Sequence, residues 1–347
     1  MTILSGLGLQ RLLRIADSLF FAKALTMADG STELGEEMTS HYGFNRFESA
    51  TVGALYMLFC VVGVTTNLLT ALTFYKDTKL LKTSKPWIHV CLALSNVLVV
   101  APSPFPASSS FSGRWLYGSS LCQFYAFEGM FVGIAAIGAV IALCIERYMV
   151  ASKPNMKENP GWFYTWSILL VVGNAFFWAV MPLLGWSRYT IEHSGTSCAI
   201  DWKNPDESYI SYMVSLEIFS FLLPVSLAVY CLRPTAGQPP EPSTSGDSTS
   251  ETSKMSDQTM APFNENQLKS ICYIFLGLVI VGWGPFAFLC TSTMFGGAQG
   301  LSMLAASLPP LACKCMVSAY PLVYAVASPR FRHSFTSVIG IFDQKQD

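Results

Sequence analysis

Seven long apolar segments, separated by shorter polar ones, dominate this chain of 347 residues. Each segment is about 20 residues or longer, which is enough for an α-helix to cross the hydrocarbon core of a bilayer. The segments lie at about 52–75, 86–110, 120–149, 163–185, 209–232, 268–293 and 303–327. The pattern predicts an all-α membrane protein, a seven-transmembrane helix bundle with spans one to five in 51–232 and spans six and seven in 263–328.

The other segments lack a span-length apolar run. Residues 1–50 include an acidic stretch from Asp29 to Glu37, which is typical of a solvated, disordered tail. Residues 233–262 are rich in Pro, Ser, Thr and Gly, and such a composition cannot bury a face, so a disordered loop is expected. In 329–347, Phe331 and Phe335 are four residues apart, which predicts a short amphipathic helix on the membrane surface.

Composition supports the membrane class and narrows the chemistry. Hydrophobic residues make up 52% of the chain and charged residues only 12%, whereas soluble domains carry about a quarter charged residues. The net charge of -1 offers no basic face for nucleic acid. The ten cysteines include no C-x-x-C pair, so the sequence does not indicate zinc.

The basic residues show which way the chain crosses the membrane. Cytoplasmic loops carry the excess of lysine and arginine. Here that excess lies in the first and third loops and after span seven: Lys76, Lys79, Lys82, Lys85, Arg147, Lys153, Lys157, Arg330 and Arg332. We therefore expect an extracellular N-terminus, a cytoplasmic C-terminus and a multi-pass protein of the plasma membrane, in contact with its lipids.

One ionisable residue, Lys314, lies near the middle of span seven. A lysine in hydrocarbon costs at least ~3 kcal/mol, so it marks a candidate functional site. One interpretation is a lysine whose stem reaches the membrane interface. Apolar turns follow Lys314, which favours the other interpretation: an amine in an apolar pocket, where loss of hydration leaves it able to form a Schiff base with an aldehyde.

Motifs in four spans point to a known family. Span one carries Gly63-x-x-x-Asn67, span three runs from Cys122 to Glu146-Arg147-Tyr148, span six carries Gly282-Trp283-Gly284-Pro285 and span seven carries Tyr320-Pro321-Leu-Val-Tyr324. Together these resemble the rhodopsin-like G-protein-coupled receptors over about residues 50–335. A lysine seven residues before the span-seven proline is the mark of opsins. The chain thus resembles an opsin of the non-visual group of neuropsins, peropsins and retinal photoisomerases.

The resemblance implies a cofactor and its surroundings. Retinal, 11-cis or all-trans, would be attached covalently at Lys314, and Cys122 would form a disulfide with Cys198 on the oxidising side of the membrane. Visual opsins place the counterion where this chain has Tyr125. The alternative counterion position of many non-visual opsins matches Glu192.

Further residues are expected around the chromophore. Two other acids, Glu128 in span three and Glu217 in span five, remain candidates for counterion, proton partner or colour tuning. The apolar pocket is expected to use small residues where the polyene passes and aromatic walls beside it. These residues are Gly129, Gly133, Trp283 and Phe286.

The resemblance also implies a switch at the cytoplasmic end. Arg147, paired with Glu146 and with Glu265, would hold the resting state, and a heterotrimeric G protein would bind once that pairing breaks. Tyr148, Pro321 and Tyr324 belong to the same motifs.

Some positions depart from the family pattern. Asn96 replaces the usual aspartate of span two, Tyr320 replaces the asparagine before the proline, and Val172 replaces a span-four tryptophan. Leu232 replaces a span-five tyrosine, and it falls where a G protein docks.

Three interpretations follow. The first is a non-enzymatic photoreceptor opsin that signals to a G protein, and the Glu-Arg-Tyr motif and Glu265 favour it. The second is a retinal photoisomerase that regenerates 11-cis retinal, and the departures at Leu232 and Tyr320 favour it. The third is a receptor for a different small ligand.

Overall fold

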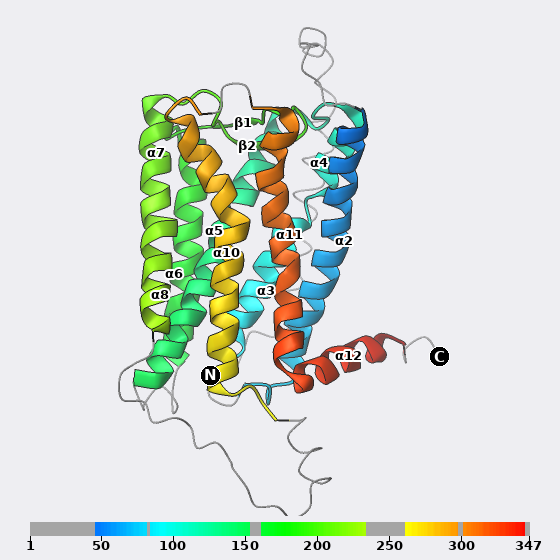
Figure 1. Cartoon of the computed structure of the whole chain (residues 1–347), viewed down its shortest axis with the longest axis vertical. Helices are drawn as coiled ribbons and strands as arrows, with labels where there is room; N and C mark the ends of the chain where they lie inside the picture. Colours follow the sequence, from blue (N-terminus) through cyan, green and yellow to red (C-terminus); the bar gives the residue numbers. More distant parts are fainter. Residues whose placement is uncertain (1–45, 82–83, 153–160, 234–260, 298–300, 344–347) are drawn as a thin grey trace, which may run out of the picture.

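The computed structural model of the chain describes residues 46–81, 84–152, 161–233, 261–297 and 301–343. The expected tail up to residue 45 and the expected loop over 234–260 lie outside the described residues. Seven helices of membrane-spanning length are found within the described part, and they run roughly side by side in one bundle (Figure 1). This confirms the predicted fold.

The spans are formed by the following helices. They are α2 (Arg46–Lys76), α3 (Trp87–Val100) followed by α4 (Pro104–Ser112), α5 (Gly118–Ser152), α6 (Gly161–Val180), α7 (Glu207–Glu217) followed by α8 (Leu223–Leu232), α10 (Glu265–Thr293) and α11 (Met303–Ala327). A 3₁₀ turn, Met181–Leu184, extends α6. The first span begins at Arg46, about two turns before its expected start.

Prolines explain why two spans are interrupted. Pro102 has no N–H to donate, and the chain turns at 101–103 between α3 and α4. In span five, a π-helical turn at Ile218–Leu222 joins α7 to α8. There the Leu223 N–H donates to the Ile218 carbonyl, so the turn holds one extra residue just before Pro224, which cannot donate.

The third span, α5, is the most buried of the seven. Its sequence from Gly133 to Ala142 is rich in glycine and alanine, and such small residues let neighbouring helices approach closely. Gly138 is one such contact, because an added Cβ would lie 3.2 Å from the Val171 side chain. Close packing of α5 fixes the side chains that it presents to the centre of the bundle.

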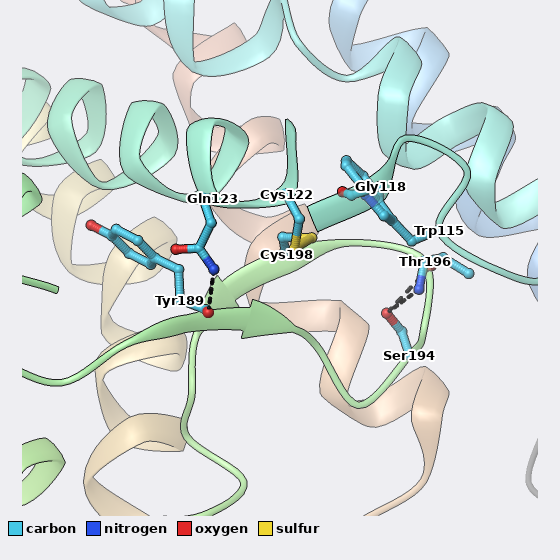
Figure 2. The surroundings of a disulfide bond; sticks show 8 residues. All are labelled: Trp115, Gly118, Cys122, Gln123, Tyr189, Ser194, Thr196 and Cys198. Atoms are coloured by element: carbon cyan, nitrogen blue, oxygen red, sulfur yellow. Dashed lines mark hydrogen bonds between the residues drawn. A yellow bond between two sulfur atoms is a disulfide. The ribbon is translucent and has the colours of Figure 1, made fainter. Parts of the chain in front are cut away.

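A two-stranded hairpin covers one end of the bundle (Figure 1). Strand β1 (Tyr189–Ile191) pairs antiparallel with β2 (Cys198–Ile200). The disulfide Cys122–Cys198 ties β2 to the first turns of α5, and Gln123 Nε2 donates to the Tyr189 carbonyl over 2.8 Å (Figure 2). The expected disulfide is present, and it holds the hairpin across the bundle.

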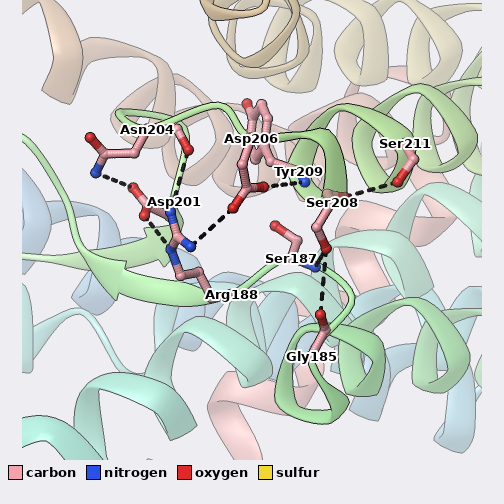
Figure 3. Close-up of polar contacts among 9 residues, drawn as sticks. All are labelled: Gly185, Ser187, Arg188, Asp201, Asn204, Asp206, Ser208, Tyr209 and Ser211. Carbon is pink, nitrogen blue, oxygen red and sulfur yellow. Dashed lines mark hydrogen bonds and ion pairs between the residues drawn. The ribbon is translucent and has the colours of Figure 1, made fainter.

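Ionic contacts hold the other side of the hairpin to α7. Arg188 contacts Asp201 over 2.6 Å and Asp206 over 3.1 Å (Figure 3). Asp206 also caps α7, because its carboxylate accepts from the Tyr209 N–H over 2.8 Å. Arg188 and Asp206 are about half exposed, so we expect these contacts to orient the loop more than to stabilise the protein.

The helix expected after span seven is α12 (Pro329–Asp343), which leaves the bundle at the end opposite the hairpin (Figure 1). Phe331 is fully buried against Phe74 and Tyr324. Arg330 and Ser334 both hydrogen-bond to Asp77. Burial alone would raise the pKa of Asp77, but these hydrogen bonds outweigh it and lower the pKa. The start of α12 is therefore fixed to the end of α2.

Candidate functional site

A cavity of about 160 Å³ lies within the bundle on the side of the hairpin. Residues from α5, α7, α10, α11 and the hairpin line it, and most of the lining side chains are apolar. The polar side chains in the wall are Tyr125, Glu128, Glu192, Ser197, Glu217, Ser220 and Lys314. Every residue that the sequence placed at the chromophore is in this wall except Gly133.

Lys314 enters the wall from α11 and is only 8% exposed. Its Nζ donates to the Val99 carbonyl over 2.7 Å. It also lies 5.9 Å from the ring centroids of Tyr56 and Tyr125, within the range of a cation–π contact. Within the described part of the chain, no carboxylate oxygen forms an ion pair with Nζ at 4.0 Å or less.

The break in span two explains why a backbone carbonyl receives this amine. In an uninterrupted helix, the Val99 carbonyl would accept from the Ser103 N–H. Here the Ser103 N–H donates to the Val100 carbonyl instead, over 3.1 Å. The Val99 carbonyl accepts from Lys314. Pro102 indicates that the helix is interrupted here. It does not indicate that Lys314 donates to the carbonyl that the interruption leaves free.

Glu192 follows β1 in the hairpin turn and is 6% exposed. Its backbone is fixed, because its N–H donates to the Ser197 carbonyl and its carbonyl accepts from the Gly195 N–H, each over 2.9 Å. Burial raises the pKa of the Glu192 carboxyl to about 7, although a hydrogen bond from the Ser197 side chain and the charge of Lys314 act in the opposite direction. Glu192 and Lys314 therefore interact across the cavity.

Tyr125 and Glu128 face the cavity from α5, about one turn apart. Tyr125 is 8% exposed and packs on Trp115, with ring centroids 5.7 Å apart. The Glu128 carboxyl interacts electrostatically with the Lys314 amine. Two carboxyl groups of the cavity wall, one from a helix and one from the hairpin, thus interact with the same amine.

The two glycines expected to make room in the pocket do so in different ways. An added Cβ at Gly129 would meet no atom within 4 Å, so this glycine leaves open space beside the cavity. An added Cβ at Gly133 would lie 2.4 Å from Trp283 Cη2. Gly133 therefore makes room for the Trp283 ring, and Trp283 and Phe286 line the cavity.

A second polar cluster lies near the ends of the spans that are opposite the hairpin (Figure 1). Arg147 is buried and contacts Glu146 over 2.6 Å and Glu265 over 3.0 Å. The structure thus brings together the three residues that the sequence grouped. It adds Ser84, which accepts from Arg147, and Tyr164, whose hydroxyl donates to Glu146.

Tyr324 and Tyr148 lie near this cluster. The Tyr324 hydroxyl is 2.7 Å from Nδ1 of His89, and its ring packs on Phe275 with centroids 5.1 Å apart. Tyr148 faces Tyr230 across 6.2 Å between centroids. Sequence reasoning did not select Ser84, Tyr164 or His89, because nothing in their local pattern indicates a long-range partner.

Comparisons with known proteins agree with this arrangement. Residues 66–324 match the family model described as "7 transmembrane receptor (rhodopsin family)". Retinochrome of Todarodes pacificus is 32% identical over 84% of this chain and 95% of that protein. The visual pigment-like receptor peropsin of Homo sapiens is 27% identical over 85% of this chain and 86% of that protein.

Two further comparisons extend the picture. The RPE-retinal G protein-coupled receptor of Bos taurus is 27% identical over 85% of this chain and 92% of that protein. The crystal structure of squid rhodopsin superposes with a TM-score of 0.72, at 20% identity, over 87% of this chain and 88% of that one. At that level of identity, the structural likeness bears on the fold alone.

Proposed function

The chain belongs to the rhodopsin family of seven-transmembrane receptors, and within it to the opsins; from this premise we propose that it is a light-sensing opsin that holds retinal covalently at Lys314. When bound, retinal supplies the absorption of light and a light-driven change of shape. The cavity residues fit this group. A mostly apolar wall suits a polyene, Gly129 leaves open space beside it, and Lys314 supplies the amine.

The observation that carries the proposal is the position of the Lys314 amine. It is buried in the cavity wall and donates to a backbone carbonyl. Because burial disfavours the ammonium ion, the neutral amine, which is the nucleophile that a Schiff-base linkage requires, is favoured. A snorkelling lysine would instead place its amine at the membrane interface.

Glu192 is our proposed counterion for the linkage. A positive charge in an apolar cavity needs a nearby carboxylate, and both Glu192 and Glu128 interact with Lys314. Glu192 lies on the hairpin that the disulfide and Gln123 fix in place. We assign Glu128 as the second carboxyl of the site, available to exchange a proton with the linkage.

Signalling to a G protein is proposed to proceed through the Arg147 cluster. Arg147 on α5 contacts Glu265 at the first turn of α10. A ligand shape that favours separation of these helices shifts the population towards a state in which the pair is broken. Arg147 would then be free to contact a partner.

A second candidate is a retinal photoisomerase with little coupling to a G protein. The observation that favours it is the cytoplasmic end of span five. Helix α8 ends at Leu232, and Arg233 is no longer helical. Span five thus ends in a leucine at the position where a tyrosine usually contributes to G-protein docking. The identity with retinochrome, at 32%, is compatible with either candidate.

The test is reconstitution of the purified full chain with 11-cis or all-trans retinal in separate samples. We expect a visible absorption band that survives acid denaturation and is absent in Lys314→Ala. Lys79→Ala, at an exposed lysine of the cytoplasmic end, is the matched control and should give the wild-type band. No band with either isomer, or a normal band in Lys314→Ala, would refute covalent binding at Lys314.

Illumination then separates the two candidates. Light-dependent nucleotide exchange on an added G protein would support the photoreceptor. Preferential binding of all-trans retinal, followed by release of the 11-cis isomer without nucleotide exchange, would support the photoisomerase instead. Extraction of the chromophore before and after illumination measures the isomers directly.

A further inference from the structure

The cavity wall has a second polar patch that the linkage at Lys314 does not use. Glu217, the last residue of α7, and Ser220, in the π-helical turn, both line the cavity. Ser220 is 5% exposed. Glu217 hydrogen-bonds to Thr291 of α10, whereas the Lys314 amine hydrogen-bonds to the Val99 carbonyl of α3. The patch therefore belongs to the side of the cavity formed by spans five and six.

Each of the two side chains has hydrogen-bonding capacity left over. The Thr291 hydroxyl lies 2.6 Å and 2.7 Å from the two Glu217 oxygens. A carboxyl has several acceptor lone pairs and this contact uses only part of them, whatever the protonation state. Glu217 can therefore still accept a hydrogen bond from a ligand in the cavity.

Ser220 offers the complementary group, a hydrogen-bond donor. Its Oγ accepts from Nδ2 of Asn174 over 3.3 Å, and Asn174 in turn accepts from Trp178 Nε1 over 3.1 Å. Among the described residues, the Ser220 hydroxyl hydrogen has no acceptor. Buried hydroxyl groups normally donate as well as accept, so this hydrogen is available to a group in the cavity.

An alcohol is the ligand group that fits this pair. An alcohol both donates and accepts, and the patch presents one acceptor, Glu217, beside one donor, Ser220. The π-helical turn supports the assignment, because such turns occur often at functional sites. If this wall contacted only a hydrocarbon ring, its carboxyl group and its buried hydroxyl hydrogen would cost free energy without forming a hydrogen bond to the ligand.

We propose that Glu217 and Ser220 bind a hydroxyl group on the ring of the chromophore, so that the ligand is a ring-hydroxylated retinal. This inference rests on the proposed function: the ring and the aldehyde are at opposite ends of retinal, so a chromophore linked to Lys314 would bring its ring to another part of the same cavity wall, which includes Glu217 and Ser220. The proposed ligand is therefore a narrower chemical class than retinal in general.

The experiment is a competition between retinal and its ring-hydroxylated forms. The purified full chain is incubated with equimolar all-trans retinal and all-trans 3-hydroxyretinal, and in a second sample with the 4-hydroxy derivative; the bound chromophores are then extracted and quantified. Two hydrogen bonds of ordinary strength should favour one hydroxylated form by roughly tenfold. Because the linkage is common to all forms, the ratio reports the ring alone.

Variants then assign the preference to the patch. We expect Glu217→Leu and Ser220→Ala each to reduce the preference towards unity while still forming pigment with plain retinal. Glu217→Gln should retain it, because an amide carbonyl still accepts and the amide NH₂ can bond to Thr291. Ser215→Ala is the matched control, since the Ser215 hydroxyl donates to the Ser211 carbonyl of its own helix and does not line the cavity.

The outcomes are distinguishable from failure of the proposed function. Pigment from every form, with no preference in the wild type, would overturn the inference and leave the opsin assignment intact. A preference that persists in both Glu217→Leu and Ser220→Ala would overturn the site assignment. No pigment from any form would overturn the proposed function and this inference together.

Discussion

Replacing Glu192 by glutamine should change how the stability of the protein without chromophore depends on pH. Burial raises the pKa of Glu192 from 4.5 to about 7 in the folded protein. A carboxyl whose pKa is higher when folded holds its proton more tightly in the folded state. Its contribution to stability is therefore fully present below pH 4.5 and is lost as the pH rises through about 7.

The size of the effect follows from the same two values. A rise from 4.5 to about 7 corresponds to about 3 kcal/mol, at about 1.4 kcal/mol for each pH unit. Glutamine has nearly the same shape and does not titrate. Wild type should therefore lose about 3 kcal/mol relative to Glu192→Gln between pH 4.5 and pH 8.

The assay is thermal unfolding of the purified chain without retinal, in lipid nanodiscs, across that pH range. Glu207→Gln, an exposed carboxyl at the start of α7, serves as the control for loss of one negative charge. As the pH rises, the melting temperature of wild type should fall relative to that of Glu192→Gln. The pH profile of Glu207→Gln should run parallel to that of wild type. Parallel profiles for all three proteins would refute the claim that Glu192 is buried with a raised pKa.

Binding of retinal gives the same prediction a second readout. In the proposed pigment, the positive charge of a linkage at Lys314 would favour ionised Glu192. The pH range over which the stability of wild type falls should therefore be lower in the pigment than in the protein without chromophore. The Glu192→Gln pigment should show no such movement.

Three other substitutions test separate parts of the structure. Gly133→Ala should destabilise the protein by about 1–3 kcal/mol, because the new Cβ would overlap the Trp283 ring, whereas Gly129→Ala should be tolerated in open space; thermal unfolding of both measures the difference. Glu265→Gln should raise G-protein activation in the dark, since it removes the ion pair at the start of α10, and an unchanged basal rate of nucleotide exchange would contradict this. Phe331→Ala should cost about 3–5 kcal/mol, because the ring is fully buried where α12 meets the bundle, and an unchanged melting temperature would contradict that packing.

The seven spans could be predicted because a bilayer imposes a length and a polarity on each helix. The disulfide and the grouping of Arg147 with Glu265 came from a resemblance to opsins, and the structure places these residues in contact. Element ends were less predictable. The first span already begins at Arg46, because a helix can extend beyond the apolar stretch that marks it.

Other contacts between residues far apart in the sequence could not be predicted. The Lys314 amine donates to the backbone carbonyl of Val99. Because every residue has a backbone carbonyl, no residue type indicates this contact. Gly133 was expected to make room for the chromophore and instead makes room for Trp283. That difference depends on the direction in which each glycine faces, which follows from the packing of α5 against α10 and not from spacing along the chain.

Helix α10 connects the cavity to the cluster around Arg147, and its contacts explain why the two regions should respond together. At the level of the cavity, Trp283 fits against Gly133 of α5, and an added Cβ at Gly282 would lie 2.9 Å from Met316 of α11. At its first turn, the same helix forms the ion pair from Glu265 to Arg147. Close packing leaves no slack at Trp283, so a ligand that changes shape there must move either the ring or the helix. If the helix moves, the ion pair lengthens, and a buried arginine that loses one of its two carboxylate partners favours a new one.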